Sequence, residues 1–297
     1  MTATCPLCGT DADLLFRTKD FNRRVTHEDF FYYRCGSCKL RFLWPVPEDL
    51  SPCYPNQYHM IPSSLAQLDS GAESERYKID LVKRFVSSGR LLEIGPGCGG
   101  FANLAKQEGF EVEAVEMDPA CCRFLEEVVG IPVINSPDVP GALASASPFD
   151  AIALWHVIEH LPDPWSTLAE AAEKLLPGGI LVVAAPNPES WQFQIMGRYW
   201  PHIDAPRHLT LIPLSLLAER ARRAGLETVL ATTTDRGSLF WNTFGWQTVL
   251  SNRFSNRYAK TVMHVAGCAV GWIFHPIEGV DGRGSAYTAI FRKKPDE

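Results

Sequence analysis

We expect this 297-residue chain to be an α/β protein, with a mostly parallel sheet of seven strands covered by helices on both faces and a small metal-binding domain at the N-terminus. Three observations predict this fold. Short apolar runs alternate with helical patterns along most of the chain, a glycine-rich stretch follows the first of these runs, and two Cys-x-x-Cys pairs precede them. With 46% hydrophobic and 21% charged residues, the chain can bury a large core.

The N-terminal cysteines form two tight pairs, Cys5 with Cys8 and Cys35 with Cys38. Two such pairs can place four thiolates around one tetrahedral zinc ion, and a site with four protein ligands has a structural role. The alternative is four buried or free thiols. Gly9 and Gly36 suit the turns that such pairs require. Strand-like aromatic runs at 30–33 and 40–44 complete what we interpret as a zinc-ribbon-like module, and we treat the remaining cysteines as packing residues.

We divide the chain into three parts. Residues 1–44 form the zinc-binding module, and residues 45–72 form a proline-rich linker that we expect to be extended. Residues 73–297 form the large α/β domain, with an insert at 236–284 that is rich in tryptophan, phenylalanine and arginine. The large domain opens with a helical pattern over 73–86.

The seven strands of the large domain are short and mostly apolar, and helical patterns separate them. This alternation is typical of a parallel sheet that is covered on both faces. We expect strands at 91–94, 112–116, 133–135, 151–155, 180–185, 228–233 and 286–291, and helices at 100–107, 120–129, 165–176 and 214–224.

The glycine-rich stretch directly after the first strand reads E-I-G-P-G-C-G-G over residues 93–100. Glycines at this point of a Rossmann-like fold allow a tight turn and the close approach of a ligand. Glu116 ends the second strand, where a carboxylate can accept hydrogen bonds from ribose hydroxyls. A nicotinamide-dependent dehydrogenase also has a glycine-rich loop followed by an acidic residue that binds a ribose. Glu93, however, stands before the glycines, where it would repel a pyrophosphate and attract an ammonium group.

Three segments together, 91–100, 112–118 and 149–160, resemble the successive signatures of class I S-adenosylmethionine-dependent methyltransferases. Four further motifs are similar to those of the subgroup related to the ubiquinone-biosynthesis enzymes, also called type 12 methyltransferases. These motifs are H-V-I-E-H-L, L-P-G-G, P-N-P, and W-P-H-I-D-A-P-R-H-L at 200–209. The resemblance covers residues 73–293. A zinc module joined to such a domain is also similar to sugar C-methyltransferases, but their additional C-terminal domain has no clear counterpart here.

The resemblance implies roles for the residues of these motifs. Glu93, Gly95 and Gly97 would hold the methionine end of S-adenosylmethionine, with Gly99 in the same loop, and Glu116 would hold the ribose. Met117 would pack against the adenine, and Trp155 and His156 would line the wall beside the sulfonium.

Three histidines are our candidate catalytic residues: His160, His202 and His208. A methyl transfer to a hydroxyl needs a base, and a neutral imidazole is the usual one. His160 follows the fourth strand of the large domain, at the edge of the sheet where ligands bind, although it could simply orient its loop. His202 and His208 flank Asp204 and Arg207; we favour His208 because Arg207 beside it would bind an anionic or polar acceptor. The alternative is a surface turn held by pairing of Arg207 with Asp204.

The insert could serve as a lid, a dimer surface, or a platform for an amphiphilic acceptor that also permits peripheral membrane contact through residues 236–280. Simple core packing is the commoner use of such residues. The apolar stretch at 262–277 is too short to span a bilayer, and no secretory signal is visible, so we expect a cytoplasmic protein. The formal net charge of -6 argues against a nucleic-acid partner.

The sequence therefore predicts methyl transfer from S-adenosylmethionine to a small-molecule acceptor, such as a sugar, a glycolipid precursor or a secondary metabolite, at oxygen. Two alternatives stay open. One is C-methylation of a nucleotide-linked sugar, and the other is a non-catalytic interaction protein that has a zinc ribbon and binds the cofactor. The acceptor and the oligomeric state cannot be read from these residues.

Overall fold

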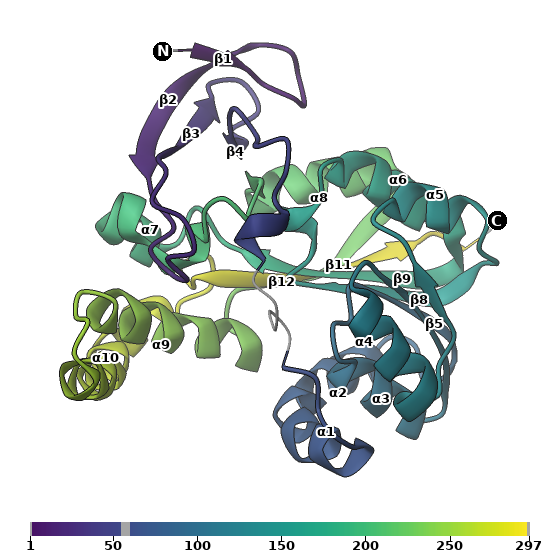
Figure 1. Ribbon diagram of the computed structural model, residues 1–297. Helices are drawn as coiled ribbons and strands as arrows, with labels where there is room; N and C mark the ends of the chain where they lie inside the picture. Colours follow the sequence, from purple (N-terminus) through teal and green to yellow (C-terminus); the bar gives the residue numbers. More distant parts are fainter. Residues whose placement is uncertain (1, 55–59, 296–297) are drawn as a thin grey trace.

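The computed structural model describes residues 2–54 and 60–295, which form two sheets (Figure 1). The larger sheet has seven strands in the order β11-β12-β9-β8-β5-β6-β7. All of them run parallel except β12, which is antiparallel to both neighbours. The strands are β5 (Gly89–Ile94), β6 (Phe110–Glu116), β7 (Val133–Asn135), β8 (Phe149–Trp155), β9 (Leu175–Pro186), β11 (Leu226–Thr232) and β12 (Ala286–Lys293). The predicted fold class of the large domain is confirmed.

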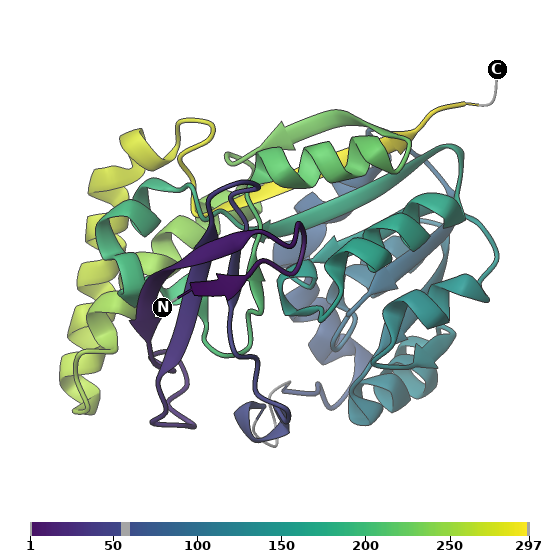
Figure 2. The same ribbon diagram turned by 90° about the horizontal axis from the view of Figure 1, so that it is seen from above.

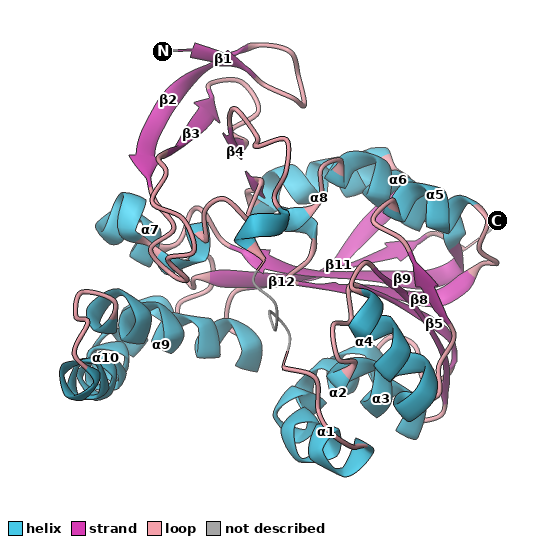
Figure 3. Ribbon diagram, in the orientation of Figure 1, coloured by secondary structure: helices cyan, strands magenta, loops and turns pink. Residues whose placement is uncertain are grey.

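Helices cover both faces of this sheet, as Figure 3 shows. Side chains of a strand alternate between the faces, so Leu91 packs on one side and Leu92 on the other. One face is covered by α1 (Leu65–Ala72), α2 (Arg76–Lys83), α3 (Gly100–Gln107) and α4 (Pro119–Phe124), and the other by α5 (Val139–Ala144), α6 (Pro164–Lys174) and α8 (Leu214–Arg223). The helix predicted at 120–129 continues from α4 as a π turn, Leu125–Val129.

The N-terminal sheet has five antiparallel strands in the order β1-β2-β3-β4-β10. They are β1 (Thr2–Thr4), β2 (Asp11–Thr18), β3 (Phe30–Cys35), β4 (Arg41–Leu43) and β10 (Thr210–Leu211). The last strand belongs to the large domain by sequence, yet it pairs with β4 of the N-terminal module. In the view from above, the purple N-terminal strands are seen between the yellow-green helices of the insert and the teal and blue helices of the large domain (Figure 2). The predicted module of residues 1–44 is therefore joined to the large domain through one continuous sheet.

The linker is not extended throughout, contrary to our expectation. Residues 51–53 form a short 3-10 turn, and α1 occupies 65–72 inside the predicted linker. Ser64 caps this helix by accepting a hydrogen bond from the amide of Gln67, and residues 63–72 contain no proline that would prevent a helix. The prediction was wrong here because the prolines lie within residues 45–62, and the extended conformation that they favour does not continue into the residues that follow. Part of the linker, residues 55–59, lies outside the described residues.

The insert folds into a pair of helices, α9 (Arg236–Ser251) and α10 (Arg257–Glu278), which project beside the sheet (Figure 1). They cross closely, because a Cβ on Gly267 would lie 2.4 Å from the Cα of Gln247. Between β9 and β10 lie α7 (Trp191–Met196) and two 3-10 turns, Gly197–Tyr199 and Pro201–Ile203. Within the described residues, no helix combines the length and the apolar character needed to cross a membrane.

Candidate active site and cysteine cluster

The glycine loop after β5 has a backbone that only glycine can adopt without strain. Gly95, Gly97 and Gly99 have φ angles of 67°, 56° and 80°. A Cβ on Gly95 would lie 2.7 Å from Val157 Cγ2, and one on Gly99 would lie 2.4 Å from Leu125 Cδ2. At the carboxyl end of β5, no side chain from these three glycines covers the backbone of the loop, so a ligand can approach it closely.

A cavity of about 660 Å³ lies beside this loop. It is lined by all eight residues that we expected to contact the cofactor: Glu93, Gly95, Gly97, Gly99, Glu116, Met117, Trp155 and His156. They come from the ends of three adjacent strands, β5, β6 and β8, and from the loops that follow them. The structure thus brings the predicted cofactor residues together, and we call this space the cofactor cavity.

Glu93 is a buried carboxylate at this cavity, 4% exposed. Its Oε2 atom has no hydrogen-bond partner among the described residues. Burial raises the pKa of Glu93 to about 8. A cationic group in the cavity would favour the ionised carboxylate and would give Oε2 its missing partner, which fits the ammonium of a methionine moiety.

Glu116 is held rigidly at the other side of the same cavity. Its carboxylate accepts hydrogen bonds from the amides of Gly97, at 2.9 Å, and of Met117 and Asp118, both at 2.8 Å. A carboxylate has about four acceptor positions, so these three bonds leave capacity for a ribose hydroxyl. The same bonds tie the end of β6 to the glycine loop.

The remaining predicted cofactor residues form the wall. Trp155 lies edge-on to Phe101, with ring centroids 5.4 Å apart, and its indole nitrogen has no described partner. Met117 is 62% exposed at the rim of the cavity. The helix α1 adds Gln67 and Gly71 to the lining, which the sequence analysis missed because it treated this stretch as an extended linker.

A second cavity of about 500 Å³ shares His156 and His160 with the first. Besides the segment after β8, which contributes His156, Glu159 and His160, three segments that are far apart in sequence line it. These are the β2–β3 loop with Asn22 and Arg23, the segment after β9 with Pro201, His202, Asp204 and His208, and α9 with Trp241, Phe244, Thr248 and Ser251. All three candidate catalytic histidines line this space, which we call the acceptor cavity.

Backbone carbonyls determine which nitrogen of each histidine carries the proton. The Nδ1 atoms of His160 and His208 lie 3.0 Å from the carbonyl of Arg207 and 2.8 Å from that of His202, respectively. The Nε2 atom of His202 lies 3.1 Å from the carbonyl of Trp241. A carbonyl only accepts, so these nitrogens donate, and in the neutral ring the other nitrogen has a free lone pair. Burial lowers the pKa of His160 to about 4 and that of His202 to about 3, so both rings are neutral at pH 7.

Glu159 lies among these histidines and is 1% exposed. Neither of its carboxylate oxygens has a hydrogen-bond partner within the described chain. Its Oε1 lies 3.6 Å from His156 Nδ1 and 4.0 Å from His208 Nε2. Burial by itself would raise the pKa of Glu159, but the neighbouring histidines, His156 first, lower it to about 2. The carboxylate therefore places a negative charge where an imidazolium would form.

Arg207 does not reach the acceptor cavity, contrary to our expectation. Its side chain is fully buried and donates to Asp20, at 2.6 Å, to Asp204, at 2.8 and 2.9 Å, and to the carbonyl of Cys53, at 3.1 Å. The pairing of Arg207 with Asp204 is present, as in the alternative that we considered, but it is buried and does not form a surface turn. This arginine is a clamp between the N-terminal module and the histidine segment.

Further contacts reinforce this clamp. The hydroxyl of Tyr32 donates to the carbonyl of His208 at 2.6 Å, and Asn22 donates to Asp204 Oδ1 at 2.7 Å. The amide of Leu43 donates to the carbonyl of Leu209 at 2.9 Å. The N-terminal module therefore fixes the position of the segment that carries His202 and His208. No sequence motif marked Asp20, Asn22 or Tyr32 for this role.

The insert closes the other side of the acceptor cavity. The ring of Trp241 on α9 lies 4.8 Å from that of His156 and 5.4 Å from that of His202, measured between centroids. Phe244, one turn further along α9, lies 5.6 Å from His202. This part of the insert covers the cavity, whereas Tyr258, Val262 and Trp272 on α10 are exposed.

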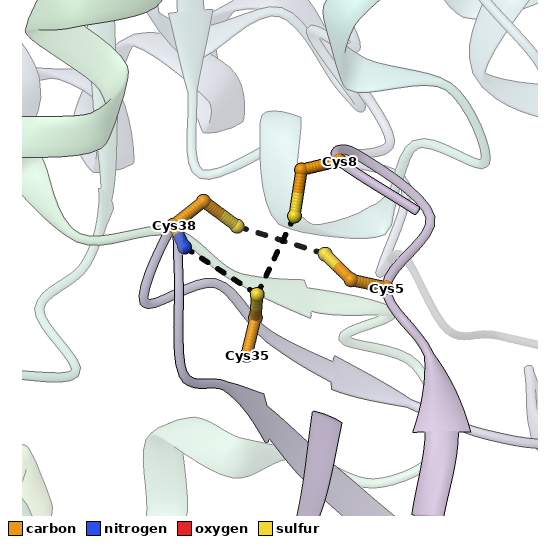
Figure 4. Close-up of side chains that lie close together, drawn as sticks. All are labelled: Cys5, Cys8, Cys35 and Cys38. Carbon is orange, nitrogen blue, oxygen red and sulfur yellow. Dashed lines mark hydrogen bonds between the residues drawn. The ribbon is translucent and has the colours of Figure 1, made fainter. Parts of the chain in front are cut away.

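The four N-terminal cysteines converge at the tips of the β1–β2 and β3–β4 turns (Figure 4). The Sγ atoms of Cys5 and Cys38 are 3.6 Å apart and those of Cys8 and Cys35 are 3.5 Å apart, and all four lie within 4.8 Å of one another. These separations are too long for disulfides and close to the roughly 3.8 Å between sulfurs of a tetrahedral zinc site. The donor set therefore fits zinc.

The two cysteine turns have the same backbone geometry, with a left-handed residue directly after the second cysteine of each pair. This residue is Gly9 in the first turn, with φ 72°, and Lys39 in the second, with φ 65°. We had assigned Gly36 to the second turn, but its φ is not positive. The repeated geometry supports one common ligand for both turns.

Comparison with known proteins agrees with this geometry. The pattern of a methyltransferase domain family matches residues 71–231. The chain is 29% identical over 174 residues to the ubiquinone biosynthesis O-methyltransferase of Cereibacter sphaeroides and 31% identical over 175 residues to that of Ruegeria pomeroyi. Both matches cover 55% of this chain and 68% of the relative.

Solved structures share the fold. A SAM-dependent methyltransferase from Archaeoglobus fulgidus superimposes with a TM-score of 0.52 at 21% identity, over 75% of this chain and 94% of that one. The cyclopropane synthase from Mycobacterium tuberculosis gives a TM-score of 0.50 at 14% identity, over 74% of this chain and 84% of that one. With the strand order, the glycine loop and the family match in agreement, the chain belongs to the class I S-adenosylmethionine-dependent methyltransferases.

Proposed function

We propose that the protein transfers a methyl group to a hydroxyl of a small molecule bound in the acceptor cavity. The observation that carries this proposal is the meeting of the two cavities at His156 and His160, with the neutral imidazole of His160 and the buried carboxylate of Glu159 beside the junction. The relatives named as O-methyltransferases support oxygen as the methylated atom. S-adenosylmethionine supplies an already electrophilic methyl group, so the chain's own residues need to align the acceptor and remove its proton.

His160 is the base in this proposal, with His208 as its neighbour. Our earlier preference for His208 depended on Arg207 binding the acceptor, and Arg207 is instead buried in its clamp. His160 lines both cavities, and its Nδ1 donates to a carbonyl. Its Nε2 is left to accept the hydroxyl proton as the acceptor oxygen bonds to the methyl carbon and the bond from that carbon to the donor's sulfur breaks. The ring of His208 lies 4.5 Å from that of His160, and the ionised Glu159 offsets the positive charge that forms on the imidazole.

The acceptor cavity is suited to a molecule that combines a flat or apolar face with hydroxyl groups. Trp241 and Phe244 offer aromatic surface, while Asn22, Thr248 and Ser251 offer polar groups. A cavity of this size accommodates a small molecule. A sugar, a glycolipid precursor or a secondary metabolite remains our proposed acceptor class, and C-methylation of a nucleotide-linked sugar is the alternative.

The test is methyl transfer from isotopically labelled S-adenosylmethionine to a metabolite pool, with products identified by mass spectrometry. The proposal predicts a labelled product with an O-methyl group. A C-methyl product would favour the sugar alternative. Saturable cofactor binding by calorimetry without a product from any pool would instead support the non-catalytic alternative.

The base is tested with His160→Ala and His208→Ala in single-turnover assays. We expect His160→Ala to lower the rate by at least about 10²-fold, while cofactor affinity stays within twofold. Ligand atoms of Glu159, His160 and His208 also lie within 4.8 Å of one another, so the wild-type enzyme is assayed again after dialysis against a chelator. Unchanged activity supports the base. Lost activity that manganese restores, in protein that elemental analysis shows has kept its zinc at the cysteine cluster, would contradict it and would indicate a metal-activated hydroxyl.

We further propose that the cysteine cluster holds one structural zinc ion. The sulfur separations and the two matching turns support this, and the four protein ligands would leave no open coordination position. Elemental analysis should find one zinc per chain, and the absence of stoichiometric zinc from freshly purified protein would contradict the proposal.

Peripheral membrane contact through the 236–280 insert is the last part of the proposal. Tyr258, Val262 and Trp272 are exposed on α10, and Arg257 and Lys260 lie near its first turn. Such a helix face resembles those that lie in a membrane interface. Co-sedimentation with anionic vesicles tests it, and a cytoplasmic location stays a prediction.

A further inference from the structure

A third cavity, of about 600 Å³, lies between the N-terminal sheet and the segment around α7. It shares no lining residue with the two cavities already described, and none of the residues assigned to methyl transfer lines it. Its walls combine apolar side chains with three arginines, namely Leu15, Phe16 and Phe193 with Arg34, Arg41 and Arg198.

Two of these arginines face one another across neighbouring strands. Arg34 on β3 is directly opposite Arg41 on β4 in the antiparallel register, so both side chains stand on the same face of the sheet. Like charges at directly opposed positions destabilise a sheet. On its other side Arg34 is opposite Asp13 on β2, whereas the other neighbour of Arg41 is Leu211 on β10. Arg41 is therefore the arginine of this pair that has no opposite charge beside it in the sheet.

Arg41 is the stronger indication, because it is 7% exposed. Its Nε and Nη1 atoms are buried without a hydrogen-bond partner, and no described carboxylate lies within ion-pair distance of its guanidinium. The guanidinium stacks over Phe193, 5.4 Å from the ring centroid. Burial lowers the pKa of Arg41 to about 10, which still leaves it charged at neutral pH. A buried, unpaired cation is costly, and such groups are normally paired with an anion.

The chain offers Arg41 only a distant, solvent-exposed carboxylate, which raises its pKa slightly and makes no ion pair with it. Glu189 is the one acidic residue that lines the cavity, and it is exposed to solvent. Arg198 donates to the hydroxyl of its neighbour Tyr199 and is also exposed, so the lining carries an excess of positive charge.

We propose that this cavity binds an organic anion. Its carboxylate or phosphate group would pair with Arg41 and Arg34, since guanidinium groups match the oxygens of both anions. Its apolar part would pack against Leu15, Phe16 and Phe193. The site lies between the N-terminal sheet and the α7 segment and shares no lining residue with the other two cavities, so this ligand is distinct from the methyl donor and the acceptor.

Calorimetric titration of the full chain tests this with three probes: inorganic phosphate, phenyl phosphate and phenylacetate. We expect saturable one-site binding of at least one aromatic anion, tighter than inorganic phosphate. The stronger of phenyl phosphate and phenylacetate identifies the anionic group. Absence of saturable binding by all three probes at millimolar concentration would overturn the proposal.

Variants locate the binding. Arg41→Met should weaken the aromatic anion at least tenfold, whereas Arg123→Met, which removes an exposed arginine on α4, should leave the affinity unchanged. In the absence of ligand, Arg41→Met should melt at the same temperature as the wild type or higher, because the substitution removes an unpaired buried charge. When phenyl phosphate is added, the melting temperature of the wild type should rise and that of the variant should not. A clearly lower melting temperature with unchanged anion affinity would assign Arg41 a purely structural role and overturn the proposal. If Arg41→Met does not fold, Arg34→Gln decides: affinity reduced at least threefold supports the site, and unchanged affinity contradicts it.

Discussion

The cofactor cavity and the acceptor cavity are built in different ways. The predicted cofactor residues lie between Glu93 and His156 and follow three adjacent strands of one sheet. The acceptor cavity shares the segment after β8 with it and adds residues from the β2–β3 loop, from the segment after β9 and from α9. No residue of the described N-terminal module lines the cofactor cavity, whereas Asn22 and Arg23 line the acceptor cavity.

The N-terminal module is attached to only one of the two cavities. Its contacts end on the segment that carries His202 and His208, through Arg207, Tyr32 and the pairing of β4 with β10. We therefore infer that the module shapes acceptor binding and catalysis and leaves cofactor binding to the large domain. The predictions below test this separation, in order of decreasing effect.

The largest effect is expected from Cys35→Ser, which removes one of four proposed zinc ligands. Structural zinc sites contribute about 10–16 kcal/mol in zinc-finger peptides, so the module should lose its metal and most of its order. Methyl transfer should fall at least tenfold, because the histidine segment loses its support. Affinity for S-adenosylmethionine should stay within about threefold. Cys268→Ser, at an exposed cysteine outside the cluster, is the control and should retain zinc and activity.

Asp20→Asn should lower the free energy of unfolding by about 3 kcal/mol, the lower end of the range for breaking a buried ion pair, since Asp204 still pairs with Arg207. Asp29→Asn is the matched control. Asp29 lies at the end of the same loop, but its ion pairs are exposed to solvent. Its removal should therefore lower the free energy of unfolding by only about 0–1 kcal/mol. Chemical denaturation measures both, and equal losses would refute the clamp.

Glu116→Ala tests the other side of the comparison. It should weaken S-adenosylmethionine by about 1.5–3 kcal/mol, the range for hydrogen bonds with a charged partner. Acceptor binding, measured with the acceptor alone, should be unaffected because Glu116 does not line that cavity. Calorimetry gives both values, and unchanged cofactor affinity would remove Glu116 from the cofactor site.

The contrast also explains what could be predicted from the sequence. The glycine loop, Glu93 and Glu116 were predictable because a strand, a tight turn and a helix encode them within a few residues. Asp20, Asn22 and Tyr32 were not, since their partners lie more than 170 residues away and a single sequence carries no signal for such contacts. Arg207 was assigned to the acceptor for the same reason: its neighbours in sequence were visible, but its buried partner Asp20 was not.

The central claim, that the N-terminal module supports catalysis through the histidine segment, is tested most directly by Tyr32→Phe. This change removes one hydroxyl, which donates to the carbonyl of His208 at 2.6 Å, and leaves that buried carbonyl without this partner, a loss of about 1–3 kcal/mol. The measurement is the single-turnover rate together with the dissociation constant of S-adenosylmethionine. Tyr33→Phe, one residue along on the opposite face of β3, is the control and should match the wild type. We predict that Tyr32→Phe slows methyl transfer about tenfold while cofactor affinity stays within twofold. An unchanged rate, or a cofactor affinity that falls in step with the rate, would contradict the account.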